Sequence, residues 1–338
     1  MRKLEHSVVV TAIRNEGPFL IEWLAWHRML GFDNVLVLHN DCTDHSPQLL
    51  RLLERAGFLT QKSQQPKDGE PPKLEAYRIA AQHKLVRKAS WALVCDVDEF
   101  LVVKTGDGGI ADLADSIGPD HMGMAINWKV FGTDGQVQWS DELVHRRFRR
   151  CGPTQTVQNK CFKVFYREPN LFGTIRSHGP ADWLGSGNWN QDIRTFVTSD
   201  GQHLETYTAN NNPPNGTEYE RISHGLAQLN HYALQSAEKY GLKRQHLSSA
   251  ANLVRYTDEF FERFDQNSQE DNSVDTYKQE FDRAYAEIMA VPGVKRLHHL
   301  CCADMVARIL ALKNEDPVWD PRWQHHMETA GTSPSHRG

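Results

Sequence analysis

An alternation of strand and helix patterns over the first hundred residues constrains the fold most strongly. Residues 7–13 read SVVVTAI, a β-branched run of the kind that a fully buried parallel strand needs. Pro18 then opens a helix, where its missing N–H costs nothing, and Gly31 closes it. The pattern continues with a strand at 35–38, a helix from Ser46 to Gly57, a helix over 73–88 and a strand at 91–95. This order predicts an α/β fold with a doubly wound parallel sheet, whose ligands bind outside the carboxyl ends of the strands.

The remainder of the chain changes character twice. Short strand-like pieces are predicted at 124–128, 137–139 and 161–165, and polar stretches at 185–187 and 210–217 predict a mobile loop. From Asn230 onward the pattern is helical, with apolar stripes on two predicted helices, and the last twenty or so residues predict a frayed tail. The length of 338 residues suits about two domains, or one domain with an extension.

Composition excludes several classes of function. The 38 basic and 43 acidic residues give a net charge of -5 without like-charge blocks, so nothing favours binding to nucleic acid. No apolar run approaches the roughly 20 residues of a membrane helix, and MRKLEHSVVV lacks the apolar region of a signal peptide, which predicts a cytoplasmic protein. The six cysteines lack zinc-ribbon spacing and are predicted to be buried free thiols. Histidine is unusually frequent, with 17 residues.

The most informative segment is Asp96-Val-Asp98, directly after the apolar strand at 91–95. In an extended chain the two carboxylates point to the same face, roughly 6.5–7 Å apart along the strand. They repel each other unless a cation neutralises them, and hard oxygen ligands suit Mg²⁺ or Mn²⁺. Such an ion takes one or two carboxylates together with substrate phosphates. The alternative is a solvated acid pair after a strand.

Two more polar segments follow strands of the predicted sheet. Arg14-Asn15-Glu16 comes after the first strand, and a polar cluster over residues 39–46 comes after the second. Ser46 is expected to cap the helix that begins there. Because the carboxyl ends of parallel strands meet at one edge of the sheet, we expect these segments to converge near the acid pair.

Four ordered segments then make the sequence familiar. They are TAIRNEGPFLIEWLAWHRMLGFDNVLVLHNDCTDHS, WALVCDVDEFL, WKVFGTDG from Trp128, and NHYALQSAEKY from Asn230. Together they resemble the family 2-like glycosyltransferases, and especially the branch related to the family 92 (DUF23-type) galactosyltransferases, over residues 7–245. The resemblance implies a GT-A fold, Rossmann-like with a mostly parallel central sheet, over residues 1–240. A helical extension would follow at 241–315 and a flexible tail at 316–338.

The resemblance also implies a nucleotide-diphospho sugar donor and Mn²⁺ or Mg²⁺ at the D-x-D motif. Asp96 and Asp98 would bind the metal, and Asp96 would also contact the ribose. His231 is the first candidate for a further metal ligand and His178 the second. The turn at 11–16 would hold the nucleotide base with the side chains of Thr11, Arg14, Asn15 and Glu16. Asn40 and Asp44 would border the base.

One departure from the family pattern concerns the second strand end. Ordinary family 2 members carry Asp-Asp-Gly-Ser-Thr-Asp where this chain has His39-Asn-Asp-Cys-Thr-Asp44. The usual base-contacting Asp is therefore Asn40, which leaves the identity of the nucleotide open.

An inverting transferase needs a general base for the acceptor hydroxyl and positive charge for the departing diphosphate. Asp182 is the preferred base and Glu142 the second candidate. The basic run at 145–150 would assist with phosphates or form a strand with an exposed face. Three tryptophans could stack on sugar rings, with a core role as the alternative for the first: Trp128, Trp183 and Trp189. The histidine pairs at 298–299 and 325–326 are interpreted as surface or packing residues.

The sequence thus leads to a hypothesis with two alternatives. The hypothesis is a metal-dependent, inverting glycosyltransferase that moves a hexose such as galactose from a UDP-sugar to a glycan or glycolipid acceptor. The C-terminal helices would pack beside the catalytic domain or serve a partner or a membrane face. A sugar-phosphate nucleotidyltransferase is one alternative, although the first turn lacks its Gly-rich basic signature. A non-catalytic glycan-binding protein is the other, and the intact acid pair argues against it.

Overall fold

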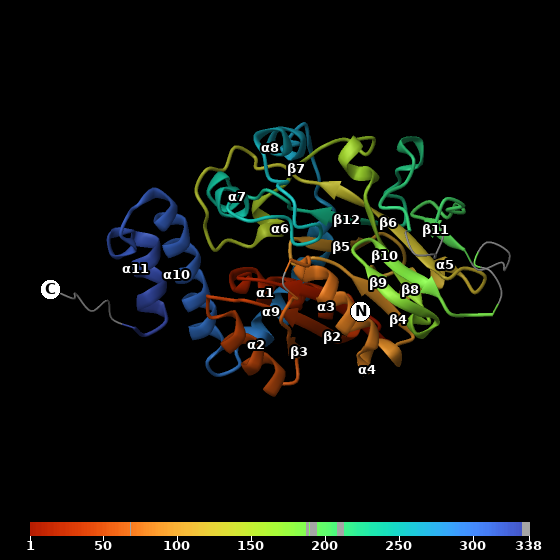
Figure 1. Ribbon diagram of the computed structural model, residues 1–338, viewed down its shortest axis with the longest axis horizontal. Helices are drawn as coiled ribbons and strands as arrows, with labels where there is room; N and C mark the ends of the chain where they lie inside the picture. The colour runs from red at the N-terminus through yellow and green to blue at the C-terminus, as the bar shows by residue number, and fades with distance from the viewer. Residues whose placement is uncertain (68, 187–188, 190–194, 208–212, 333–338) are drawn as a thin grey trace.

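The computed structural model of the protein is built around one curled central sheet (Figure 1). It describes residues 1–67, 69–186, 189, 195–207 and 213–332. Within these residues the sheet has the order β3-β2-β1-β4-β8-β6-β12-β5, with β11 paired to β6. The strands are β1 (Leu4–Ile13), β2 (Phe32–His39), β3 (Thr60–Ser63), β4 (Trp91–Val94), β5 (Glu99–Val103), β6 (Gly123–Val130), β8 (Phe162–Arg167), β11 (Phe196–Thr198) and β12 (Ala227–His231).

The sheet is mostly parallel, as predicted. Strands β1 to β4 pair in parallel, and so do β6, β11 and β12. Only β8 and β5 run against their neighbours in this sheet. Two short antiparallel ladders lie outside it, one of β9 (Phe172–Arg176) with β10 (Gly179–Trp183) and one of β7 (Arg150–Cys151) with β13 (Gln269–Glu270).

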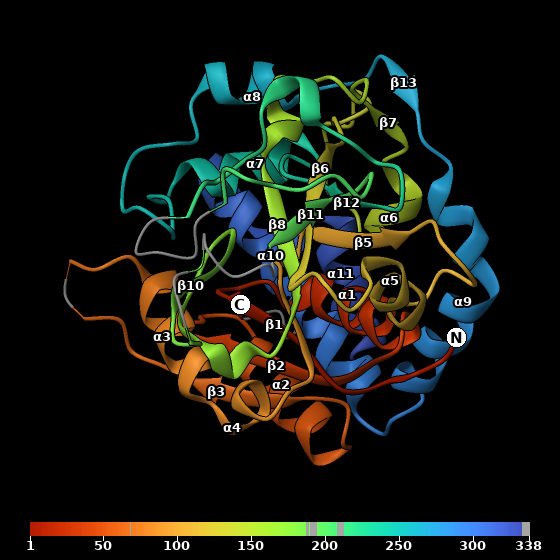
Figure 2. The ribbon, with the colours of Figure 1, turned by 90° about the vertical axis from the view of Figure 1, so that its right-hand side faces the viewer.

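Helices cover both faces of the sheet, which explains the unbroken apolar run of β1. Val9 points into one core, whereas Val8 and Val10 point into the other. Figure 2 shows α3 and β10 on one side of the sheet and α1, α5 and α9 on the other. The helices are α1 (Gly17–Met29), α2 (Ser46–Arg55), α3 (Pro72–Gln82), α4 (Lys84–Arg87), α5 (Ile110–Ile117), α6 (Val144–Arg147), α7 (Ala237–Arg244), α8 (Asp258–Phe264), α9 (Lys278–Met289), α10 (Val294–Lys313) and α11 (Pro321–Thr329).

The C-terminal helices share the core of the α/β fold. α9 and α10 both pack on α1, and Phe281 and Ile309 lie in the same apolar cluster as Trp26. Gly17 permits the close approach of α1 to α10, because a Cβ at that position would collide with the Cys301 thiol. The predicted extension therefore packs against the same core as the central sheet. No helix among the described residues combines the length and apolar character needed to cross a membrane.

Several local predictions were wrong. The helix expected over 73–88 breaks at His83, whose backbone is extended, so that α3 and α4 are separate. Residues 137–139 form no strand, and the basic run expected as a strand begins in the short helix α6. Within the predicted tail, Pro321–Thr329 form helix α11, which packs on α10. The predicted mobile loop lies partly outside the described residues, at 187 and 210–212. All six cysteines are free, and four of them are buried.

A buried carboxylate explains why the basic run does not form a strand. Glu22 of α1 accepts the backbone N–H groups of Val144 and His145, each at 3.0 Å, and lies 2.6 Å from Nδ1 of the His145 ring. The side chains of Glu22 and His145 are 5% and 3% exposed. Two backbone N–H groups and one side chain of α6 thus contact the Glu22 carboxylate of α1. These contacts stabilise the first turn of α6.

Glu22→Gln is expected to lower the free energy of unfolding by about 2–4 kcal/mol, because it removes the buried charge and puts an amide donor against N–H donors. Urea unfolding followed by circular dichroism measures the loss. Asp282→Asn is the matched control, since it weakens the exposed Arg146–Asp282 ion pair beside it and should cost less than about 1 kcal/mol. Equal losses in the two variants would contradict this assignment.

Candidate active site

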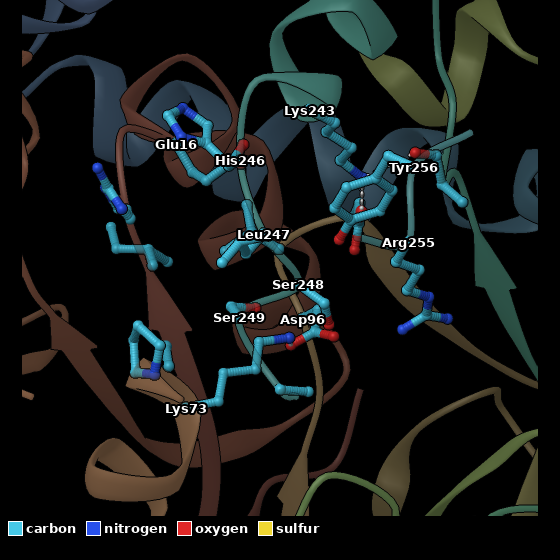
Figure 3. Close-up of a pocket in the computed structure, with 18 of the residues that line it drawn as sticks. Glu16, Lys73, Asp96, Lys243, His246, Leu247, Ser248, Ser249, Arg255 and Tyr256 are labelled. Carbon is cyan, nitrogen blue, oxygen red and sulfur yellow. Dashed lines mark hydrogen bonds and ion pairs between the residues drawn. The ribbon is translucent and has the colours of Figure 1, made fainter. Parts of the chain in front are cut away.

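A pocket of ≈ 420 Å³ lies at the carboxyl ends of the central strands (Figure 3). Arg14 and Glu16 line it from the turn after β1, and Asp96 and Asp98 from the turn after β4. His231 enters from the end of β12, and residues 245–256, which follow α7, close the other side. The position agrees with the rule for ligand sites in doubly wound sheets.

The acid pair lies in a tight turn between β4 and β5. The Glu99 N–H donates to the Asp96 carbonyl oxygen at 3.0 Å, which closes the turn. The extended geometry predicted for Asp96 and Asp98 was therefore wrong. The sharp change of direction arises because β5 leaves β4 to pair with β12.

Lysine side chains hold both aspartates in the ionised form. Lys73 Nζ lies 2.6 Å from Asp96 Oδ1, and Lys163 Nζ lies 3.6 Å from Asp96 Oδ2. Burial opposes ionisation of Asp96, but Lys163 and Lys73 outweigh it and hold the pKa of this carboxyl well below its usual range. Lys243 Nζ lies 2.7 Å from Asp98 Oδ2, and its charge outweighs burial and lowers the pKa of Asp98 to about 2.

Glu99 lies on the buried side of this turn. It is fully buried and accepts the Trp128 Nε1–H and the Asp96 backbone N–H, both at 2.8 Å. Burial raises the pKa of Glu99 to about 8; Lys163 opposes this, and the charges of Asp96 and Asp98 add to it. Glu99 therefore fixes the acid turn and the Trp128 ring relative to each other.

Of the two predicted histidines, His231 lies in the pocket. Its Nε2 is 3.9 Å from Asp98 Oδ1, its ring centroid is 4.1 Å from that of Trp128, and its buried Nδ1 has no hydrogen-bond partner in the described structure. Burial lowers the pKa of His231 to about 3, so the ring is neutral. His178 lines a neighbouring pocket instead, with Nδ1 2.9 Å from the Phe162 carbonyl oxygen.

The donor set partly suits a divalent cation. Two ionised carboxylates and a neutral imidazole are ligands that Mn²⁺ accepts. Among the described residues, however, the ligand atoms of Asp96, Asp98 and His231 do not gather within 4.8 Å of one another. The ammonium groups of Lys73 and Lys243 lie against the two carboxylates in this structure.

The residues predicted to hold the nucleotide divide into two groups. Arg14, Glu16 and Asn40 line the pocket, and Glu16 is paired with Lys239 at 3.1 Å. The other three, Thr11, Asn15 and Asp44, are buried outside its lining.

Two of these buried residues tie the neighbouring loops together. Asn15 Oδ1 accepts the N–H groups of Thr43 and Asp44, and Asp44 in turn accepts those of Gly17 and Ser46. The prediction that Ser46 caps α2 was wrong: Ser46 is the first residue of the helix, the N-cap position is His45, and the Ser46 N–H and hydroxyl both donate to Asp44. Asn15 and Asp44 therefore stabilise the loops next to Arg14 and Glu16.

The predicted bases lie outside the lining of the pocket. Asp182 in β10 accepts the Thr174 hydroxyl at 2.6 Å, and Glu142 is an exposed loop residue that accepts the Ser140 hydroxyl. Two of the three tryptophans also lie elsewhere, because Trp183 and Trp189 pack on each other and on Phe172, while Trp128 lines the pocket.

Sequence reasoning missed the cations of the site. The missed side chains come from the start of α3, from β8, from α7 and from the segment after it: Lys73, Lys163, Lys239, Lys243 and Arg255. One signal was available. Lys239 and Lys243 are four residues apart on one helix, which places both on one face, next to the NHY motif.

The mostly parallel sheet with helices on both faces agrees with the GT-A fold that the sequence predicts. The model of glycosyltransferase family 92 matches residues 7–284, and the chain belongs to this family. The protein is thus a glycosyltransferase, and the predicted fold and enzyme class are confirmed. The match also extends past residue 245, where the recognised resemblance ended.

Solved structures give only distant likenesses. S. aureus TarS 1–349 is 15% identical over 96% of this chain and 90% of that chain, with a TM-score of 0.33. The same fragment in complex with UDP-GlcNAc has 14% identity over 96% of this chain and 92% of that chain, with a TM-score of 0.31. The mannosyltransferase Ktr4p from S. cerevisiae is 10% identical over 38% of this chain and 41% of that chain, with a TM-score of 0.24. A search of curated proteins gives no significant match.

Proposed function

We propose that the protein is a metal-dependent, inverting glycosyltransferase that moves a hexose from a UDP-sugar to a glycan or glycolipid acceptor. The observation that carries the proposal is the pair of ionised carboxylates, Asp96 and Asp98, in a pocket at the sheet edge where such folds bind nucleotides. Family membership gives the reaction class, and the pocket is the binding site proposed for the donor.

The charges of the pocket suit a nucleotide diphosphate. Arg14, Lys73, Lys243 and Arg255 all line it. Positive groups that face a departing diphosphate stabilise the charge that develops on it as the glycosidic bond to the donor breaks. Two of these side chains, Lys73 and Lys243, are held in the pocket by their ion pairs with Asp96 and Asp98.

Asp96, Asp98 and His231 would hold Mn²⁺ or Mg²⁺ in this proposal. The ion would act as a Lewis acid on the diphosphate oxygens. His231 is neutral, the form that ligates metals, and its partner Asp98 is ionised. Neither Asp182 nor Glu142 is proposed as the general base, since both lie outside the lining of the pocket.

Nucleotide and metal are expected to stabilise the protein together. UDP with Mn²⁺ should raise the Tm by about 4 °C at ligand concentrations 100-fold above Kd, while either alone raises it less. Thermal unfolding with UDP, GDP and CDP, each with and without Mn²⁺, makes the comparison. A UDP-release assay with different UDP-hexoses then identifies the donor. If no nucleotide shifts the Tm under any condition, the result would contradict the proposed transferase and favour a non-catalytic glycan-binding protein.

A further inference from the structure

A second cluster of potential ligands lies where the C-terminal helices meet the catalytic fold. It contains Asp141 from the loop before α6, His299 from α10 and His326 from α11, and one ligand atom of each lies within 4.8 Å of the other two. None of the three lines the pocket around Asp96. Figure 1 shows α10 and α11 side by side at one end of the molecule.

The two histidines are buried, contrary to a surface role. His299 is 8% and His326 is 2% exposed, and their Nδ1 atoms are 3.0 Å apart. Without an ion, one ring has to donate its Nδ1–H to the other. With an ion, both Nδ1 atoms act as ligands, and nitrogens bound to one tetrahedral zinc are about 3.3 Å apart. The observed separation fits both cases.

Charge and access favour an ion at this place. Both imidazole rings are buried, and one nitrogen of each lies within 4.8 Å of a carboxylate oxygen of Asp141, so the three groups can share one ion. Asp141 brings one negative charge, and it lines a pocket of ≈ 260 Å³ together with His326. Arg322 lines this pocket too, but Glu238 and Asp320 hold its guanidinium at 2.7 and 2.9 Å.

We propose that Asp141, His299 and His326 bind a divalent transition-metal ion, Zn²⁺, with solvent at the fourth position. Two imidazole nitrogens and one carboxylate are typical zinc ligands and disfavour Mg²⁺ and Ca²⁺. The ion joins three segments that are far apart in the sequence. It fixes α10 and α11 to the loop before α6.

Zinc binding to metal-free protein tests this proposal. The parent protein carries Asp98→Asn so that the catalytic pocket does not compete for metal. Zn²⁺ at 100-fold above Kd should raise its Tm by about 4 °C, and Co²⁺ should give the visible absorption of a tetrahedral site. Adding Asp141→Ala should weaken Zn²⁺ binding at least about tenfold, as expected for loss of a metal ligand or its partner.

Two further variants make the result specific. His326→Gln should abolish the Co²⁺ absorption, whereas His325→Gln, which alters the exposed neighbour in the same pocket, should leave it unchanged. Asp141 is exposed, so its variant should match the metal-free Tm of the parent, which separates loss of binding from loss of folding. Equal Zn²⁺ affinity in the parent and in Asp141→Ala would overturn the proposal, as would no Zn²⁺ binding to the parent.

Discussion

Asp96→Asn and Asp98→Asn are each expected to lower kcat/KM for sugar transfer about 10³-fold, or about 4 kcal/mol of transition-state stabilisation. Each variant keeps the shape of the side chain but removes one charge from the proposed metal site. It also leaves an ammonium group without its carboxylate, Lys73 in the first case and Lys243 in the second. Initial rates of UDP release in the presence of Mn²⁺, with donor and acceptor varied, measure the loss.

Asp182→Asn and Glu142→Gln are matched controls, because they neutralise the two carboxylates that sequence reasoning took for the base. Both residues lie outside the lining of the pocket, so transfer should stay within about threefold of the unmodified protein. A Tm within about 3 °C of the unmodified protein shows that each variant is folded. Activity retained by Asp98→Asn but lost by Asp182→Asn would refute the proposed site.

The sequence predicted those features that depend on local patterns. The buried β-branched run of β1, the helix opened by Pro18 and the acid pair after β4 are all visible over a few residues. Together with the known behaviour of parallel sheets, they predict a ligand site at the sheet edge where the pocket lies. The four ordered motifs then supplied the family, which composition alone does not indicate.

Features that depend on distant partners could not be predicted. The basic run forms α6 because it meets Glu22, 122 residues earlier in the chain. Lys163 reaches the acid turn from β8, which lies beside β4 only in the folded sheet. Helix α11 likewise packs on α10, a contact that its own residues do not reveal. In each case a tertiary contact overrides a local preference, and a single sequence does not reveal the contact.

Buried histidines are expected to weaken the fold as the pH falls below 6.5. His27 is fully buried, and its Nδ1–H donates to the Trp23 carbonyl oxygen at 2.9 Å. Burial lowers its pKa to about 4, and it lowers that of His224 to about 4 as well. The unfolded chain binds these protons near pH 6.5, whereas the folded protein does not. The stability that they contribute is present above pH 6.5 and lost toward pH 4, with about 2 kcal/mol lost per histidine at pH 5.

Glu99 changes the stability in the opposite direction as the pH falls. The pH dependence of the unmodified protein alone therefore does not isolate the contribution of the histidines. Its pKa is raised to about 8, and the stability that it contributes is present at low pH and lost as the pH rises from about 4.5 to 8. A comparison of variants cancels this contribution, because Glu99 is common to all of them.

His27→Gln removes one of the titrating groups. Between pH 5 and 6 the slope of its unfolding free energy should therefore be flatter than that of the unmodified protein by about 1 kcal/mol per pH unit. His325→Gln, at an exposed position of α11, should leave the slope unchanged. Urea unfolding at four pH values in the presence of a chelator gives the three slopes. Parallel curves for all three proteins would mean that the folded protein binds a proton at His27 as readily as the unfolded chain does.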